Sequence, residues 1–380
     1  MHGRHASASS SLIGARIVAL LFVAGSLAAC GGASQGAAAA PAPESAGAAA
    51  GAVSDAPWPI KTREHLDLWL HGFAMLQADT TKIPYFRRGY RDQMIVEHNR
   101  RGVSTQLDQN RSALSARFAV NRNLVGAQFV ALYFGSWDEM SRAIDLFLQA
   151  RGDPGRATDQ GQQAVIAFLA NSFPSQQDRD WLALFKQSLT DEYSRFYHEY
   201  WLAEQRTRAP VLAAADSVWQ KVYRPKLQTF LSRTQQQTGD LDLSLPLQAE
   251  GRTVTAGKRA NAVAVIFPDR RDAAVEAVYA AAHEFIGAIA NTAIADNVTP
   301  AERREGVVDR IASNALVRGG ALLLQKTAPE LADGYARFYL RAAGVSATGD
   351  AQATLVREFP LPELIRDAIN RQIDSVLGGI

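Results

Sequence analysis

The chain of 380 residues contains a single cysteine, Cys30, and no excess of charge of either sign. One thiol cannot close a disulfide within the chain, and it cannot supply the several thiolates of a cysteine-based structural zinc site. The 40 Lys and Arg residues are balanced by 38 Asp and Glu residues, which gives a net charge of +2. This balance, without a basic cluster, argues against a nucleic-acid partner bound through its phosphates. Burial of a hydrophobic core must provide the stability, and the chain is long enough for it.

An apolar run at residues 17–24 follows a start that carries Arg4 and Arg16. The run is too short to span a bilayer as a permanent helix, and small residues follow it, which is the layout of a secretory signal. The sequence Leu27-Ala28-Ala29-Cys30 resembles a bacterial lipobox. That resemblance implies that residues 1–29 are a lipoprotein signal peptide and that Cys30 is lipidated, with the lipid bilayer as a partner. An ordinary signal with an unrelated cysteine is the alternative.

Residues 30–57 are predicted to form a flexible tether after the cleavage site, because they are almost entirely Ala, Gly, Pro and Ser. A coil of about 25 residues spans roughly 25–30 Å, enough to hold a domain clear of the lipid headgroups. Gly31 stands where an Asp would resemble an inner-membrane retention signal. The expected location is therefore the cell envelope, with a lipid anchor in the outer membrane.

Residues 58–380 are predicted to form one mostly helical domain, or two closely packed lobes at about 58–236 and 237–380. Apolar side chains recur at helical spacing through most of this segment, including a long stretch from about 176 to 206. A further helix contains Pro225, which should kink or split it.

Three short strands are predicted at 241–245, 253–255 and 262–267. The first alternates apolar and polar residues, which is typical of a half-buried strand. The fold class expected from these elements is mainly α with a small β-sheet, that is, α+β.

The third predicted strand precedes a helix, expected from about Asp272 to Thr292, that carries His283-Glu284. A strand followed by a helix bearing His-Glu resembles the gluzincin zinc peptidases, whose His-Glu-x-x-His motif supplies two metal ligands and a general base. The resemblance implies that His283 is a metal ligand and Glu284 the base. It also implies a carboxylate ligand from a following helix, for which Glu305 and Asp309 are suitably spaced. The second ligand position holds Gly287, which cannot bind metal.

Two hypotheses follow from this broken motif. In the first, His283 is a core histidine and the domain is a non-catalytic, peptidase-like module without cofactor that binds a peptide or protein partner in the envelope. In the second, the chain is a zinc-dependent peptidase in which Glu284 is the base and a distant residue replaces the missing ligand. The remaining histidines that could do so are His65, His71, His98 and His198.

Residues 83–90 mix aromatic side chains with Arg87 and Arg88. Such a segment is typical of a helix start flanked by boundary aromatics, and it also has the chemistry to bind an anion or a glycan. The sequence leaves both interpretations open.

Overall fold

The structure is a computed structural model that describes residues 57–77, 81–121, 123–255 and 258–378. The predicted signal peptide, Cys30 and the tether up to residue 56 lie outside the described residues. The described part is mainly α-helical with one small sheet, so the predicted fold class is confirmed. Its first part contains β1 (Ile60–Lys61), α2 (Glu64–Leu76), α3 (Tyr90–Arg101), α4 (Gln106–Val120), α5 (Asn123–Gly126), η1 (Ala127–Tyr133), α6 (Trp137–Gln149), η2 (Pro154–Arg156), α7 (Gln160–Ser172), α8 (Gln176–Glu192), η3 (Tyr193–Tyr197), α9 (His198–Val218), η4 (Trp219–Tyr223) and α10 (Arg224–Arg233).

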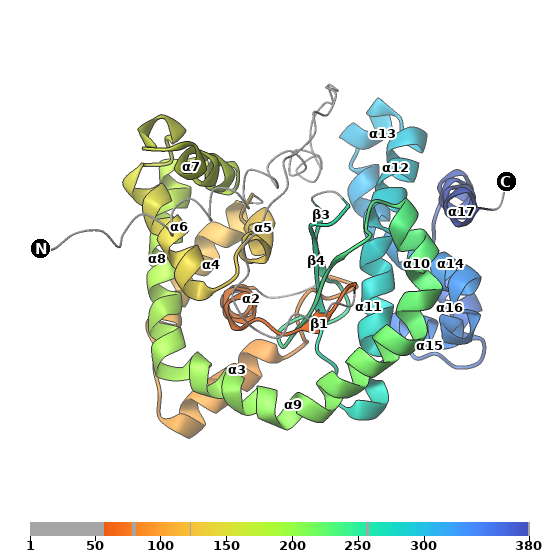
Figure 1. Ribbon diagram of the computed structural model, residues 1–380, viewed down its shortest axis with the longest axis horizontal. Coiled ribbons are helices and arrows are strands. Elements are labelled where there is room, and N and C mark those ends of the chain that lie inside the picture. The colour runs from red at the N-terminus through yellow and green to blue at the C-terminus, as the bar shows by residue number, and fades with distance from the viewer. Residues whose placement is uncertain (1–56, 78–80, 122, 256–257, 379–380) are drawn as a thin grey trace, which may run out of the picture.

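The second part begins with the sheet and then returns to helices. It contains β2 (Gly239–Ser244), β3 (Arg252–Thr255), β4 (Asn261–Ile266), η5 (Arg271–Ala273), α11 (Glu276–Phe285), α12 (Gly287–Asn297), α13 (Pro300–Arg304), α14 (Val307–Thr327), η6 (Pro329–Leu331), α15 (Ala332–Ala342), α16 (Ala351–Glu358) and α17 (Glu363–Leu377). Figure 1 shows α4, α6, α7 and α8 on one side, α10–α17 on the other, and the sheet and α2 between them.

The sheet has the order β1-β2-β4-β3, in which β1, β2 and β4 are parallel and β3 runs antiparallel to β4. The three predicted strands are present, within two residues at each end. β1 has only two residues, too few to produce a sequence pattern. Because Ile60 pairs with Leu241, a division of the domain near residue 236 would separate two paired strands.

The strand β2 is buried on both faces, so the prediction of a half-buried strand was wrong. Asp242 and Ser244 are as fully buried as Leu241 and Leu243. The Asp242 carboxylate can be buried because it forms an ion pair: its Oδ1 lies 3.0 Å from the Arg63 Nε. The polar residues that alternate along β2 therefore face the interior of the protein and not the solvent.

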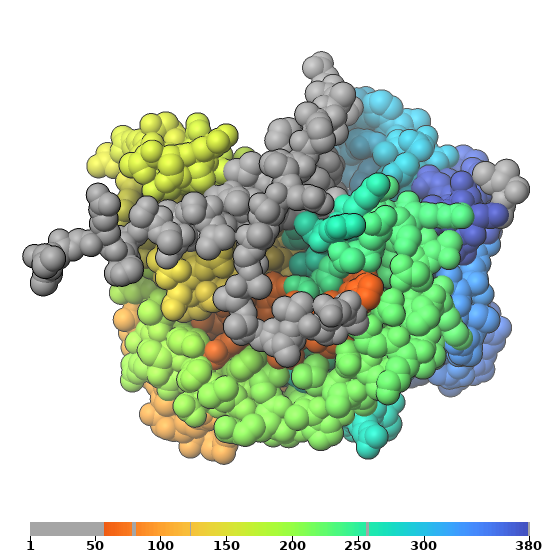
Figure 2. Space-filling view, viewed as in Figure 1, coloured from red at the N-terminus to blue at the C-terminus, as the bar shows by residue number. Residues whose placement is uncertain are grey.

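The helical segments from α8 to α10 follow one another without a break over residues 176–233, beyond the predicted end near 206. Two π-helical turns, η3 and η4, interrupt the α-helical hydrogen bonding. Pro225 is the second residue of α10, in the first turn after η4, which fits the predicted irregularity because proline has no N–H to donate. In Figure 2 this run, coloured yellow-green to green, extends across the lower part of the face in view and up its right side.

The helix predicted over 272–292 is two α-helices, α11 and α12, because the backbone turns at Ile286. By length and composition the helical stretch Arg271–Asn297 is the one described segment able to cross a membrane, and 67% of its apolar window is buried inside the protein. That burial is what a core helix of a globular domain shows.

Replacement of Gly72 by alanine should destabilise the protein. A Cβ there would lie 2.6 Å from the Phe185 Cζ and 2.7 Å from the Leu189 Cδ2, both on α8. These side chains are buried, so we expect a loss of about 1–3 kcal/mol in the free energy of unfolding, measured by urea denaturation. Gly287→Ala is the matched control, because open space surrounds Gly287 and alanine favours helix by up to about 1 kcal/mol. Equal stability of the two variants would contradict this account of the α2–α8 contact.

Candidate functional site

His283 lies in α11, which follows β4, so the strand–helix order behind the peptidase resemblance is present. Its Nδ1 is 2.9 Å from the Glu284 Oε1, and its ring stacks on Tyr339 with centroids 5.3 Å apart. The imidazole is 1% exposed, and its Nε2 has no hydrogen-bond partner among the described residues. This is the geometry of a core histidine held through one ring nitrogen.

Both carboxylate oxygens of Glu284 are bonded to the β3 region. The Gly251 N–H donates to Oε1 at 2.9 Å, and the Thr253 hydroxyl donates to Oε2 at 2.5 Å. Burial opposes ionisation, but the bond and charge of His283 and these two donors hold the pKa of Glu284 below its ordinary value. The carboxylate therefore acts as an ionised clamp between α11 and β3.

Glu305 and Asp309, the predicted carboxylate ligands, are exposed. Gly320 of α14 packs against His283, since a Cβ there would lie 3.3 Å from the His283 Cα. Asp309 precedes Gly320 by eleven residues in the same helix, roughly 16 Å along its axis at 1.5 Å per residue. Glu305 lies earlier still, at the end of α13. The structure does not bring either carboxylate to His283.

The other histidines have partners of their own. His65 Nε2 lies 2.9 Å from the Phe134 carbonyl oxygen, and His198 Nδ1 lies 2.7 Å from the Glu64 carboxylate. His71 and His98 both contact Glu192. Across the described residues, no group of three or more His, Cys, Asp or Glu side chains is placed to hold a metal ion.

A cavity of about 670 Å³ opens where β2 and β4 end. Leu245 and Ile266 line it at the carboxyl ends of these parallel strands, the edge at which ligands bind in open parallel sheets. Helices α3, α9, α11 and α15 supply most of the other walls. The lining residues are Arg87, Arg88, Tyr90, Gln93, Tyr200, Arg208, Leu245, Gln248, Ile266, Asp269, Arg270, Ala273, Glu276, Phe338, Arg341 and Ala342. We call this cavity the arginine pocket.

Within the lining of the arginine pocket, Arg87 is hydrogen-bonded to several groups at the edge of the sheet. Its Nε donates to the Leu245 carbonyl at 2.7 Å, and a terminal nitrogen donates to the Phe267 carbonyl, so one guanidinium joins the ends of β2 and β4. Asp269 accepts from both Arg87, at 2.6 Å, and Arg208, at 2.8 Å. Burial opposes ionisation of Asp269, yet the two guanidinium groups lower its pKa. Arg87, Asp269 and Arg208 therefore form one hydrogen-bonded, charged group in the lining.

Arg88 and Arg341 also line the pocket. Arg341 pairs with Glu276 at 2.5 Å, whereas Arg88 donates to the Ala342 carbonyl at 3.1 Å and forms no ion pair within the described ranges. Five arginines thus face two carboxylates in the lining. This excess of positive charge gives the cavity an affinity for anions.

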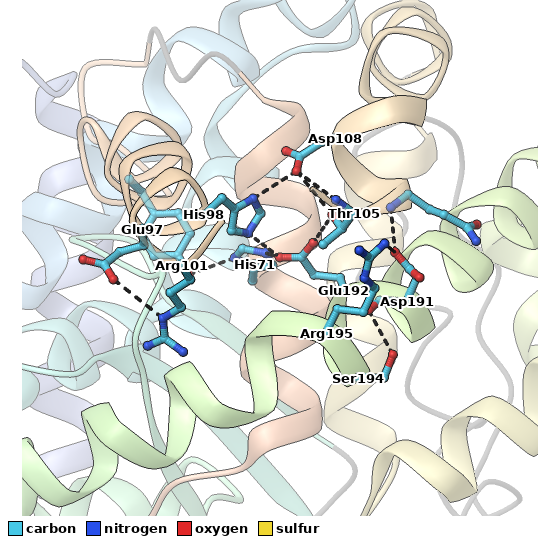
Figure 3. A network of polar contacts seen from close by, with 12 residues as sticks. His71, Glu97, His98, Arg101, Thr105, Asp108, Asp191, Glu192, Ser194 and Arg195 are labelled. Atoms are coloured by element: carbon cyan, nitrogen blue, oxygen red, sulfur yellow. Dashed lines mark hydrogen bonds and ion pairs between the residues drawn. The ribbon is translucent and has the colours of Figure 1, made fainter. Parts of the chain in front are cut away.

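A buried polar network lies beside the arginine pocket (Figure 3). The Glu192 Oε1 is 3.1 Å from the His71 Nε2 and 2.9 Å from the His98 Nε2. The Thr105 hydroxyl donates to the second oxygen, at 2.5 Å, and His98 Nδ1 lies 3.0 Å from the Asp108 carboxylate. One carboxylate of α8 therefore joins histidines from α2 and α3.

The network separates the pKa values of its members. Burial favours neutral Glu192, but hydrogen bonds from His71 and His98 outweigh it and lower the pKa of Glu192 to about 2. Burial likewise opposes charge on His98, but Asp108 and Glu192 raise its pKa to about 9. Glu192 is thus a carboxylate and His98 an imidazolium at neutral pH.

Tyr90, the first residue of α3, belongs to both sites. It lines the arginine pocket, and its hydroxyl is 3.1 Å from the His71 Nδ1. Sequence analysis placed Arg87, Arg88 and Tyr90 in a segment able to bind an anion, but it missed the link to His71 and Glu192. These residues are far apart in the chain and no local spacing joins them.

Glu284→Gln should lower the free energy of unfolding. Glutamine has one oxygen and one NH₂ group, so it cannot accept hydrogen bonds at both of the positions that now contact Gly251, Thr253 and His283. We expect a loss of about 1–3 kcal/mol, measured by urea denaturation. The exposed Glu305→Gln should stay within about 0.5 kcal/mol of the parent. A stable E284Q protein would argue for a catalytic and not a structural role of this carboxylate.

Glu192→Gln should remove a pH-dependent part of the stability. The pKa of Glu192 is lowered from 4.5 to about 2, so its contribution is present above pH 4.5 and is lost as the pH falls through 2. The pKa of His98 is raised from 6.5 to about 9, so its contribution is present below pH 6.5 and is lost as the pH rises through 9. The network therefore stabilises most between about pH 4.5 and 6.5.

We expect E192Q to lose about 3–5 kcal/mol at pH 5.5 and less at pH 9, by urea denaturation at both values. Glu199→Gln, an exposed position further along the same helical run, is the matched control. A uniform loss at both pH values would contradict the assigned charges.

Comparison with known proteins returns no relatives. No protein-family model matches the chain, and no curated protein or solved structure is significantly similar to it.

Proposed function

We propose that this protein is an envelope-anchored, non-catalytic binding lipoprotein whose arginine pocket binds a small anionic ligand. The observation that carries the proposal is the cavity at the strand ends, where five arginines face two carboxylates. A volume of about 670 Å³ suits a small organic molecule, since such sites usually measure about 300–1,000 Å³.

The walls indicate the chemistry of the ligand. Guanidinium groups bind carboxylates and phosphates through two parallel hydrogen bonds. Tyr200 and Phe338 add aromatic surface, and Leu245 and Ile266 add aliphatic surface. A compound with one or two carboxylate or phosphate groups on an apolar body matches both kinds of wall.

A zinc peptidase is the weaker alternative. Its base, Glu284, is bonded to Gly251 and Thr253, and its first ligand, His283, is buried against Tyr339. We propose a small anion as the ligand in place of the peptide or protein partner expected from the sequence. Anchoring through Cys30 completes the proposal and is tested by mass spectrometry of the membrane-extracted protein, which should show a diacylated or triacylated N-terminal cysteine.

Arg88→Gln should weaken anion binding. A suitable probe is benzene-1,3-disulfonate, which keeps two negative charges at every working pH and has an apolar ring. Loss of one hydrogen bond to a charged group should raise the Kd, measured by isothermal titration calorimetry, by roughly tenfold or more. Arg100→Gln is the matched control, because Arg100 is exposed on α3 and pairs with Glu97 outside the pocket.

The same titration in added salt separates binding in the pocket from non-specific attraction. Screening weakens both, but only the pocket should keep a saturable one-to-one complex. Absence of saturable binding to the parent protein, or equal loss in R88Q and R100Q, would refute the proposed site.

A further inference from the structure

We infer that the arginine pocket binds its anion together with a proton, which His71 accepts while the hydroxyl of Tyr90 turns toward the ligand. This inference rests on the proposed anion-binding function and adds its regulation by pH. It starts from the position of Tyr90, which lines the cavity with its hydroxyl 3.1 Å from the His71 Nδ1.

The hydrogen positions on His71 follow from its partners. A carboxylate only accepts hydrogen bonds, and the pKa of Glu192, about 2, keeps it ionised. The His71 Nε2, 3.1 Å from the Glu192 Oε1, must therefore carry a hydrogen. In neutral His71 the other nitrogen, Nδ1, then has none and accepts from the Tyr90 hydroxyl.

Protonation of His71 reverses that second bond. Nδ1 gains a hydrogen and donates to the Tyr90 oxygen, so the Tyr90 hydroxyl hydrogen is released and needs a new acceptor. An anion in the arginine pocket is such an acceptor, and hydrogen bonds to charged acceptors are about twice as strong as neutral ones. The added positive charge also favours an anion nearby.

Other titratable groups also face this contact and define the controls. Tyr197 of η3 packs against the His71 ring with centroids 4.5 Å apart, and its hydroxyl, which interacts with that of Tyr90, is the competing acceptor within the protein for the Tyr90 hydrogen. Tyr200 of α9 also lies near Tyr90. Asp67 of α2 is fully buried and accepts from the Leu245 N–H at 3.2 Å, next to the cavity. Burial raises the pKa of Asp67 to about 7, so its protonation is the main competing source of pH dependence.

The remaining charged groups lie either in the Glu192 network, beside His71, or in the arginine pocket, beside Tyr90. His98 meets the same Glu192 oxygen as His71, with Asp108 behind it. Inside the pocket, Glu276 and Asp269 are paired with Arg341 and with Arg87 and Arg208. Tyr90 is the group that joins the two sets, because it lines the pocket and bonds to His71.

The test is calorimetric titration of the whole chain with benzene-1,3-disulfonate at pH 6, 7 and 8, in pairs of buffers with different ionisation enthalpies. The expected result is tighter binding at lower pH, by up to about tenfold per pH unit for one linked proton. The difference between buffers should show net uptake of a proton on binding. This measurement needs only the parent protein, so it stands even where a variant fails to fold.

Tyr90→Phe keeps the ring against the cavity and removes the hydroxyl, so its Kd should change much less with pH than that of the parent, and its proton uptake should fall. Tyr223→Phe, outside the lining, should keep the parent's pH dependence.

Parent binding with a constant Kd and no proton uptake overturns the inference and leaves the proposed function intact. A pH slope that is as steep in Y90F as in the parent but disappears in Asp67→Asn also overturns it, because the proton then resides on Asp67. Absence of binding at every pH refutes the proposed function and the inference with it.

Discussion

The arrangement of the site depends on one guanidinium, that of Arg87, which holds the carboxyl ends of β2 and β4 together. Parallel strands have no hairpin to fix their ends, so the backbone carbonyls that follow them need partners from elsewhere. Arg87 supplies these partners from the segment before α3, and Asp269 ties the same group to Arg208 of α9. The pocket exists because elements from three parts of the chain meet at this edge of the sheet.

Buried charge is the second constraint, and the fold satisfies it with donors from separate helices. Glu192 accepts from His71, His98 and Thr105, whereas Asp67 accepts from Trp201 and from the Leu245 N–H. Removal of one partner from such a group leaves an unpaired charge in the interior, which costs far more than a surface contact gains. These carboxylates therefore specify how α2, α3, α8 and the sheet pack, in addition to any part they take in binding.

Local patterns predicted local structure well and tertiary chemistry poorly. The helix and strand signals were sound, because apolar spacing acts within a few residues. The burial of Asp242 escaped prediction because its partner, Arg63, lies far away in the sequence. The His283-Glu284 pair matches the first half of the peptidase motif in sequence. In the structure Glu284 is hydrogen-bonded to Thr253 of β3, a contact that the spacing of residues in the sequence does not reveal. Of the residues that line the pocket, the sequence indicated only Arg87, Arg88 and Tyr90, because residues 83–90 combine arginine with aromatic side chains.

The two π-helical turns determine which way each part of the long helical run faces. Each residue advances an α-helix by about 100°, and a π turn inserts one residue into that count, so it resets the rotational phase of everything after it. Before η3 the run presents Glu192 to the histidines, and after it the run presents Tyr200 and Arg208 to the arginine pocket. One continuous helical run can thus contribute to both the buried Glu192 network and the arginine pocket. A one-residue deletion within 193–197 would be a change of phase, which turns the second face away while leaving its sequence intact.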